Sequence, residues 1–103
     1  MMVVKLTEIY KVNKLSEDGS MKDSFSLRDV FVNPEHVVCL REDEIHRQLL
    51  LENRLIQDLD KMQVFTKVYL NRGQSGIDLI VVGGPPAIQE KLGLSSNKQL
   101  LRG

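Results

Sequence analysis

The chain has 103 residues, the length of one domain. Its 14 Lys and Arg residues balance its 14 Asp and Glu residues; this neutrality argues against a nucleic acid polymer as partner, because each phosphate that a protein neutralises needs a cation. The single cysteine cannot form an internal disulfide. No apolar run approaches the roughly 18 residues of a membrane helix, and no secretion signal is visible. We therefore expect a soluble protein of the reducing cytoplasm.

The first forty residues alternate apolar and polar side chains, the pattern of half-buried strands. Three strands are predicted in this part of the chain: Met2–Val12, Ser24–Val32 and His36–Arg41. The first two are joined by a polar connection that turns at Asp18 and Gly19. Asn33 and Pro34 separate the second strand from the third, because both residues favour a turn. The sequence therefore predicts a hairpin with a solvated tip, followed by a third strand.

The stretch after the third strand contains neither Gly nor Pro and is rich in helix formers. Ile45, Leu49, Ile56 and Leu59 recur at helical spacing, and the acidic residues at its start suit the helix dipole. We predict one long central helix over Asp43–Leu59. Its apolar face is wide for a helix that packs on a small sheet. Two interpretations remain: the face forms a subunit interface, or the helix simply packs on the sheet of its own chain.

A second hairpin and a short helix complete the predicted elements. Gln63–Asn71 alternates cleanly, and Ile77–Val82 is apolar on both faces except at Asp78, which is typical of a strand inside a sheet. A helix is predicted over Pro85–Leu92, because proline is favoured in the first helical turn.

These elements predict a small α+β domain, an antiparallel five-stranded sheet with one long central helix and a short C-terminal helix. The domain is expected over residues 1–92, and a polar tail over residues 93–103. A chain of this length buries a smaller share of its surface than a larger one, so we also expect association of copies into a homo-oligomer.

No pattern of catalytic or metal-binding residues is visible. His36 and His46 lie in different predicted elements, and no HxxxH, CxxC or HExxH pattern is present. The contiguous carboxylates Glu42–Glu44 should splay around a helix start instead of converging. Cys39 lies in an apolar run, which favours a buried thiol over a nucleophile. We therefore expect no metal, no cofactor and no enzymatic activity.

Two glycine-bearing connections could contact a phosphate. Arg72–Gly76 offers a guanidinium, backbone N–H groups and a hydroxyl in one turn. Gly83–Pro86 leads into a helix, whose N-terminal N–H groups favour anions, although its prolines remove two of those donors. For both segments the favoured interpretation is an ordinary connection that uses the conformational freedom of glycine.

A stacking surface is predicted on the strand before the second turn. Phe65 and Tyr69 would lie on one face with Lys67 between them, and aromatic rings interleaved with cations are used by proteins that bind single-stranded nucleotides. Packing of these rings in the core or at an interface is the favoured alternative, because the chain has only five aromatic residues with which to bury this face.

The order of segments VKLTEIY, DVFVNPEHVVCLRED, a helical insert and FTKVYLNRGQSGIDLIVVGGPPAIQEKL resembles small phage proteins, most closely the Thoeris anti-defence sponge family. The similarity covers about Val4–Leu92. It implies a phage protein in the cytoplasm of an infected bacterium, which binds, without cleaving it, the cyclic NAD-derived nucleotide of TIR immune enzymes. Some members also hold cyclic oligonucleotides of other anti-phage systems such as CBASS. The resemblance further implies oligomers from dimer to hexamer, with pockets at subunit junctions.

A second resemblance competes with the first. The pattern LT, then VNPEHV, then a strand and a glycine-turn hairpin is similar to the small flagellar FlbD-type proteins. Those proteins are shorter and lack a long central helix, so the predicted helix favours the sponge family. The alternative function is a protein–protein adaptor or regulator without a nucleotide ligand.

The sponge resemblance implies a site with cations for phosphate, a ring for stacking and polar groups for a base edge. The candidate ligand-binding residues are Arg28, Arg41 and Arg72 for phosphate, Phe65 for stacking, and Asn71, Gln74 and Ser75 for polar contacts.

Overall fold

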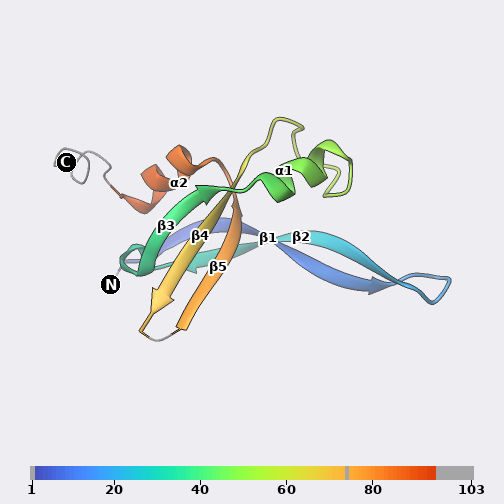
Figure 1. The fold of residues 1–103 in the computed structure, drawn as a ribbon, viewed down its shortest axis with the longest axis horizontal. Helices are drawn as coiled ribbons and strands as arrows, with labels where there is room; N and C mark the ends of the chain where they lie inside the picture. Colours follow the sequence, from blue (N-terminus) through green and yellow to red (C-terminus); the bar gives the residue numbers. More distant parts are fainter. Residues whose placement is uncertain (1, 74, 95–103) are drawn as a thin grey trace.

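The computed structural model describes residues 2–73 and 75–94 (Figure 1). In this part of the chain five strands form one antiparallel sheet in the order β2-β1-β5-β4-β3. The elements are β1 (Val4–Leu15), β2 (Met21–Val32), a 3₁₀ turn (Pro34–His36), β3 (Val37–Glu42), α1 (Glu44–Leu51), β4 (Phe65–Arg72), β5 (Ser75–Val82) and α2 (Pro85–Leu92). The predicted α+β class and five-stranded antiparallel sheet are confirmed, and so are the short C-terminal helix and the central position of β5.

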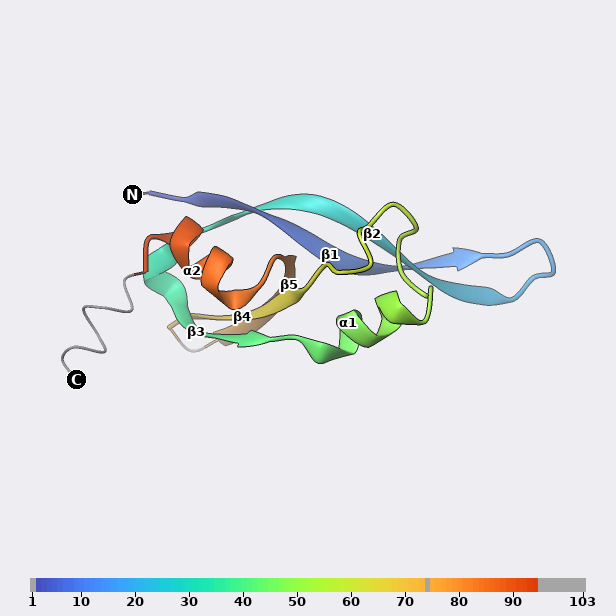
Figure 2. The same ribbon diagram turned by 90° about the horizontal axis from the view of Figure 1, so that it is seen from above.

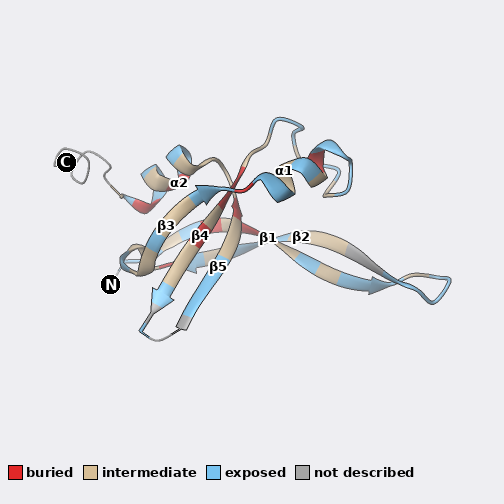
Figure 3. Cartoon of the chain, in the orientation of Figure 1, coloured by how far each residue is buried: buried red, intermediate tan, exposed pale blue. Residues whose placement is uncertain are grey.

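The apolar side chains form two clusters, because successive residues of a strand point to opposite faces of the sheet. Val81 of β5 belongs to the cluster covered by α2, whereas its neighbours Ile80 and Val82 pack with the cluster covered by α1. The buried members of the first cluster are Leu6, Val32, Val68, Val81, Ile88 and Leu92, and those of the second are Ile9, Leu50 and Phe65. Figure 3 shows this buried material where the strands cross beneath the helices. Covering on both faces explains why β5 is apolar on both.

The predicted central helix over Asp43–Leu59 is wrong in length, since α1 has only eight residues and ends at Leu51. Asn53 has a left-handed backbone conformation, with φ of 59°. Its N–H donates to the carbonyl of Leu50, and the next N–H, of Arg54, donates to the carbonyl of Leu49. This pair of bonds is the Schellman arrangement that ends helices, and asparagine is one of the few residues that adopt the required conformation readily.

The apolar residues beyond Asn53 still pack on the core, but from an irregular segment. Leu55, Ile56 and Leu59 are partly buried against the second cluster. The Arg47 guanidinium holds this segment by donating to the backbone carbonyls of Lys61 and Gln63. The apolar residues whose spacing predicted a helix therefore do pack against the core, but the segment that contains them is not helical.

The first hairpin is longer than predicted, and its far half stands apart from the rest of the sheet. β1 and β2 have 12 residues each and pair along their whole length, from Val4 opposite Val32 to Leu15 opposite Met21. In the described part of the chain, the pairing of β1 with β5 is restricted to Glu8 opposite Val81. Beyond that point the β1–β2 hairpin runs away from the β4–β5 hairpin (Figures 1 and 2).

Most of the predicted tail, residues 95–103, lies outside the described residues. Its first residues are described: Gly93 ends α2 with φ of 72°, and Leu94 packs against the first cluster. Within residues 2–73 and 75–94, no helix is long and apolar enough to cross a membrane.

Candidate ligand-binding site

Two cations lie side by side where β3 pairs with β4. The register places Arg41 directly opposite Lys67, and Cys39 opposite Tyr69. Side chains at directly opposed positions of antiparallel strands share a face and lie close together. Lys67 and Tyr69 also share that face because they are two residues apart on β4. The strand pairing therefore gathers a guanidinium, an ammonium and a phenol ring from residues far apart in the sequence.

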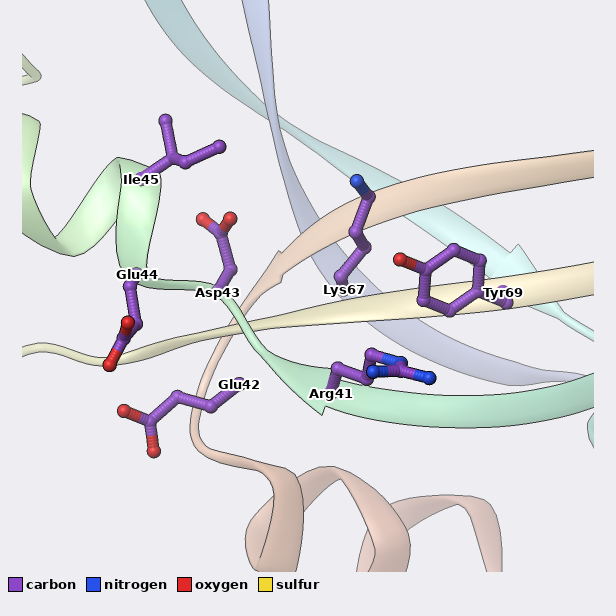
Figure 4. Close-up of a pocket in the computed structure, with 7 residues that line it drawn as sticks. All are labelled: Arg41, Glu42, Asp43, Glu44, Ile45, Lys67 and Tyr69. Carbon is purple, nitrogen blue, oxygen red and sulfur yellow. The ribbon is translucent and has the colours of Figure 1, made fainter.

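These three side chains line an open cleft with a volume of about 470 Å³. The cleft is lined by Arg41, Glu42, Asp43, Glu44, Ile45, Lys67 and Tyr69. In Figure 4, Arg41, Lys67 and Tyr69 gather on one side, whereas Glu42 and Glu44 point away from them. The carboxylates splay around the helix start, as their contiguous positions predicted, so the side of the cleft that contains Arg41 is cationic and aromatic.

The two cations differ in their partners. The Lys67 ammonium lies 3.9 Å from the carboxylate of Asp78, which is half exposed, and 5.5 Å from the centre of the Tyr69 ring. Within the described residues, Arg41 has neither an ion pair nor a side-chain hydrogen bond. Its guanidinium is therefore available to a ligand, while Lys67 is only weakly neutralised at this distance.

Asp43 lines the cleft and is buried there, and it has a structural role. Its carboxylate is the N-cap of α1 and accepts hydrogen bonds from the backbone N–H of His46 at 3.0 Å and from the His46 ring Nδ1 at 2.6 Å. The His46 ring is edge-on to Phe25, with ring centres 5.8 Å apart. The sequence analysis did not predict this pair. An aspartate that accepts a hydrogen bond from the backbone N–H three residues later is nevertheless common at the start of a helix.

Phe65, the candidate stacking residue, is completely buried, so the stacking role is wrong for this ring and the favoured alternative, packing in the core, is confirmed. Phe65, Lys67 and Tyr69 do follow the alternation of one strand, as predicted. However, α1 and the segment after it cover the Phe65 end, where the ring packs with Ile9 and Leu50. Only the Lys67 and Tyr69 end of this face is open to a ligand.

Arg28 lies away from the cleft. It pairs with Glu8, whose position in β1 is on the face of Leu6 and therefore of the first cluster. The Arg28 Nε donates to the Glu8 carboxylate at 2.8 Å, and the guanidinium carbon is 4.0 Å from the centre of the Tyr10 ring. The hydrogen bond to Glu8 raises the pKa of Arg28. This guanidinium already has an anionic partner, so it is a weaker candidate for phosphate binding.

The remaining candidates lie at the β4–β5 turn, at the opposite end of β4 from Phe65. Arg72 and Ser75 form the last pair of the two strands, and Gly73 between them has a left-handed φ of 68°. Asn71 is exposed, and Gln74 lies outside the described residues. The predicted ligand-binding residues thus fall in separate places. Of those whose side chains are described, which are Arg28, Arg41, Phe65 and Asn71, only Arg41 lines the cleft.

Comparisons with protein-family models, with curated proteins and with solved structures find no match for this chain. Among the described residues, no three His, Cys, Asp or Glu side chains are grouped in a way that could hold a metal ion.

Proposed function

We propose that the protein binds a small nucleotide-type anion without converting it, and that Arg41, Lys67 and Tyr69 hold the ligand. The ligand class is the one implied by the sponge resemblance, a cyclic NAD-derived nucleotide or a cyclic oligonucleotide. In an infected bacterium, sequestering such a signal would keep it from its immune effector.

The opposition of Arg41 and Lys67 carries this proposal. Like charges directly opposite each other on paired strands are destabilising by up to about 1 kcal/mol. An anion between them converts that repulsion into two attractive interactions, and phosphate oxygens suit both a guanidinium and an ammonium. The unpaired state of Arg41 among the described residues supports the same conclusion.

The other side chains of the cleft fit the remaining parts of a nucleotide. The Tyr69 ring offers a surface on which a base can stack, and Ile45, which is 68% exposed, adds an apolar surface at the other side of the cleft. The cleft is shallow, whereas tight sites enclose about 70–90% of a ligand surface. A homo-oligomer that places a second subunit over the cleft would supply the missing wall, which is why we include self-association in the proposal.

The proposal is tested by titrating the purified protein with cyclic ADP-ribose-type nucleotides and cyclic oligonucleotides in a calorimeter. Heating the complex should then release the nucleotide intact, as shown by mass spectrometry, and the protein should protect an immune effector from activation. Arg54→Gln is a matched control, because Arg54 is exposed and paired with Glu52, outside the cleft. No binding of any of these nucleotides, or a nucleotide recovered in altered form, would contradict the proposal.

A protein–protein adaptor of the FlbD type is the second candidate. Helix length favoured the sponge family, but α1 has eight residues, so that distinction no longer applies. A second cleft of about 240 Å³, lined in part by Leu55, Ile56 and Leu59, gives a partner protein an apolar surface. An adaptor would give no thermal shift with nucleotides, and substitutions in this second cleft, not at Arg41, would impair its function.

A further inference from the structure

The far half of β1 has a strand on one side and an open edge on the other. β2 pairs with all of it, whereas the pairing with β5 is restricted to the Glu8–Val81 position in the described chain. Figures 1 and 2 show the hairpin continuing beyond the sheet, past α1 and the segment after it, until its end stands with no other element beside it. The backbone of Val12–Leu15 therefore faces solvent along the edge that β5 would otherwise occupy.

This arrangement is unfavourable for a single copy in water. A two-stranded ribbon is at best marginally stable without a third strand or a packed face, and an open strand edge is a template for pairing with another chain. At the end of the ribbon, Leu15 and Met21 lie opposite each other and are 71% and 63% exposed. An added strand along β1 would give the ribbon its missing support and cover part of this apolar surface.

We propose that the added strand is the far half of β1 from a second copy of this chain, paired antiparallel about a two-fold axis at Val12. The result is a four-stranded ribbon in the order β2-β1-β1-β2. A two-fold axis makes the same surface serve both partners, so an edge of this kind must complement itself. This interface gives the proposed homo-oligomer a defined contact, and it does not depend on any ligand.

The charges of β1 select the register. Centring the axis on Lys11 or on Lys14 would place like charges directly opposite each other, which is destabilising. Centring it on Val12 places valine opposite valine and Leu15 of one copy opposite Ile9 of the other, at the edge of the second cluster in which Ile9 is buried. It also places Lys14 opposite Tyr10, whose ring already has the Arg28 guanidinium on one face and offers a cation the other. Of these registers, the one at Val12 joins apolar side chains and opposes no like charges.

The outer edge of the hairpin is the competing surface, and it is less suited to self-pairing. Arg28 and Asp29 lie in the middle of β2, and charged side chains on edge strands discourage pairing with another chain. Arg28 is moreover occupied by its ion pair with Glu8. The inner edge also carries charges, at Lys11 and Lys14, but they lie on either side of the apolar Val12 at its centre.

The experiment measures mass by sedimentation velocity over a range of concentrations, without ligand. Wild type should dimerise. Val12→Lys and Val12→Glu should each be monomeric, because each places two like charges on the axis, and an equimolar mixture of the two should form a heterodimer. The mixture also shows that both variants are folded. Ser24→Lys is the matched control: Ser24 lies opposite Val12 on β2, in the same hairpin but away from the proposed contact.

Three outcomes would overturn the proposal. The first is a wild type that stays monomeric at every concentration. The second is a Val12→Lys dimer as stable as wild type together with a Ser24→Lys monomer, which would assign the contact to the outer edge. The third is the absence of a heterodimer from the mixed variants. The first outcome would also contradict the self-association included in the proposed function, whereas calorimetric titration of nucleotides against Val12→Lys tests binding at Arg41 separately, so the failures of the two proposals can be told apart.

Discussion

Arg41 and Lys67 are directly opposed on neighbouring strands, although 25 residues and a helix separate them in the sequence. Such a pair of cations costs stability unless an anion lies between them. Residues that lower stability in the free protein and raise affinity for a ligand are a common feature of binding sites. A substitution that removes the charge of Arg41 should therefore raise the stability of the free protein and lower its affinity for the ligand.

Arg41→Gln should raise the melting temperature of the free protein slightly, because it relieves repulsion worth a few tenths of a kcal/mol, up to about 1 kcal/mol. The same change should weaken nucleotide binding by about 10–100-fold, the loss of a charge-assisted hydrogen bond worth roughly 1.5–3 kcal/mol. Thermal unfolding and calorimetry check the two effects separately. A variant that is less stable and binds normally would assign Arg41 a purely structural role.

Phe65 and Tyr69 should respond in opposite ways to truncation, although they lie on one face of one strand. Phe65→Ala empties a completely buried site, so we expect a loss of about 3–5 kcal/mol in the free energy of unfolding. Tyr69→Ala removes a partly exposed ring and should cost much less stability while impairing nucleotide binding. Urea unfolding of both variants is the measurement. Similar losses for the two would be inconsistent with this structure.

Much of the fold was predictable, because the strands and α2 follow local signals. Alternation marked the strands, and proline and glycine marked the ends of α2. The length of α1 was not predictable from periodicity, since the apolar residues after Asn53 recur at helical spacing but pack from an irregular segment. The deciding feature is one asparagine in a left-handed conformation, and its effect depends on the tertiary contacts that hold the chain after it.

The site was less predictable than the fold. Whether Phe65 is exposed depends on where α1 lies, and the meeting of Arg41 with Lys67 depends on the register between β3 and β4. Neither is encoded in the spacing of residues within one strand. The segment around Arg72 was one of two local signals for phosphate binding, but Arg72 lies at the β4–β5 turn, at the opposite end of β4 from Phe65.

The end of α1 gives a third prediction. Asn53→Gly should leave stability unchanged or raise it slightly, because glycine adopts the left-handed conformation at no steric cost. Asn53→Ala should destabilise the protein by about 1 kcal/mol, since alanine pays for that conformation. Gln57→Ala, in the irregular segment that follows, is the control. Equal stability of the glycine and alanine variants would show that the backbone at residue 53 is not left-handed.

The turn between β1 and β2 should keep its hydrogen bonds until the pH approaches the lowered pKa of Asp18. Hydrogen bonds from Ser16 and Ser20 lower the pKa of Asp18 from 3.8 to about 2. Because the pKa is depressed by folding, the stabilisation is complete above pH 3.8 and is lost as the pH falls towards 2. The chemical shift of the Ser20 amide, whose N–H donates to this carboxylate at 3.0 Å, reports the titration. A midpoint near 3.8 would mean that the turn does not hold the carboxylate.

Calorimetric titration of the wild type and of Arg41→Gln with cyclic ADP-ribose-type nucleotides and cyclic oligonucleotides tests the proposed function most directly. We expect at least one of these nucleotides to bind the wild type, to be recovered intact after heating, and to bind the variant about 10–100-fold more weakly. Equal affinity for the two proteins, or no binding to either, would contradict the assignment of the cleft.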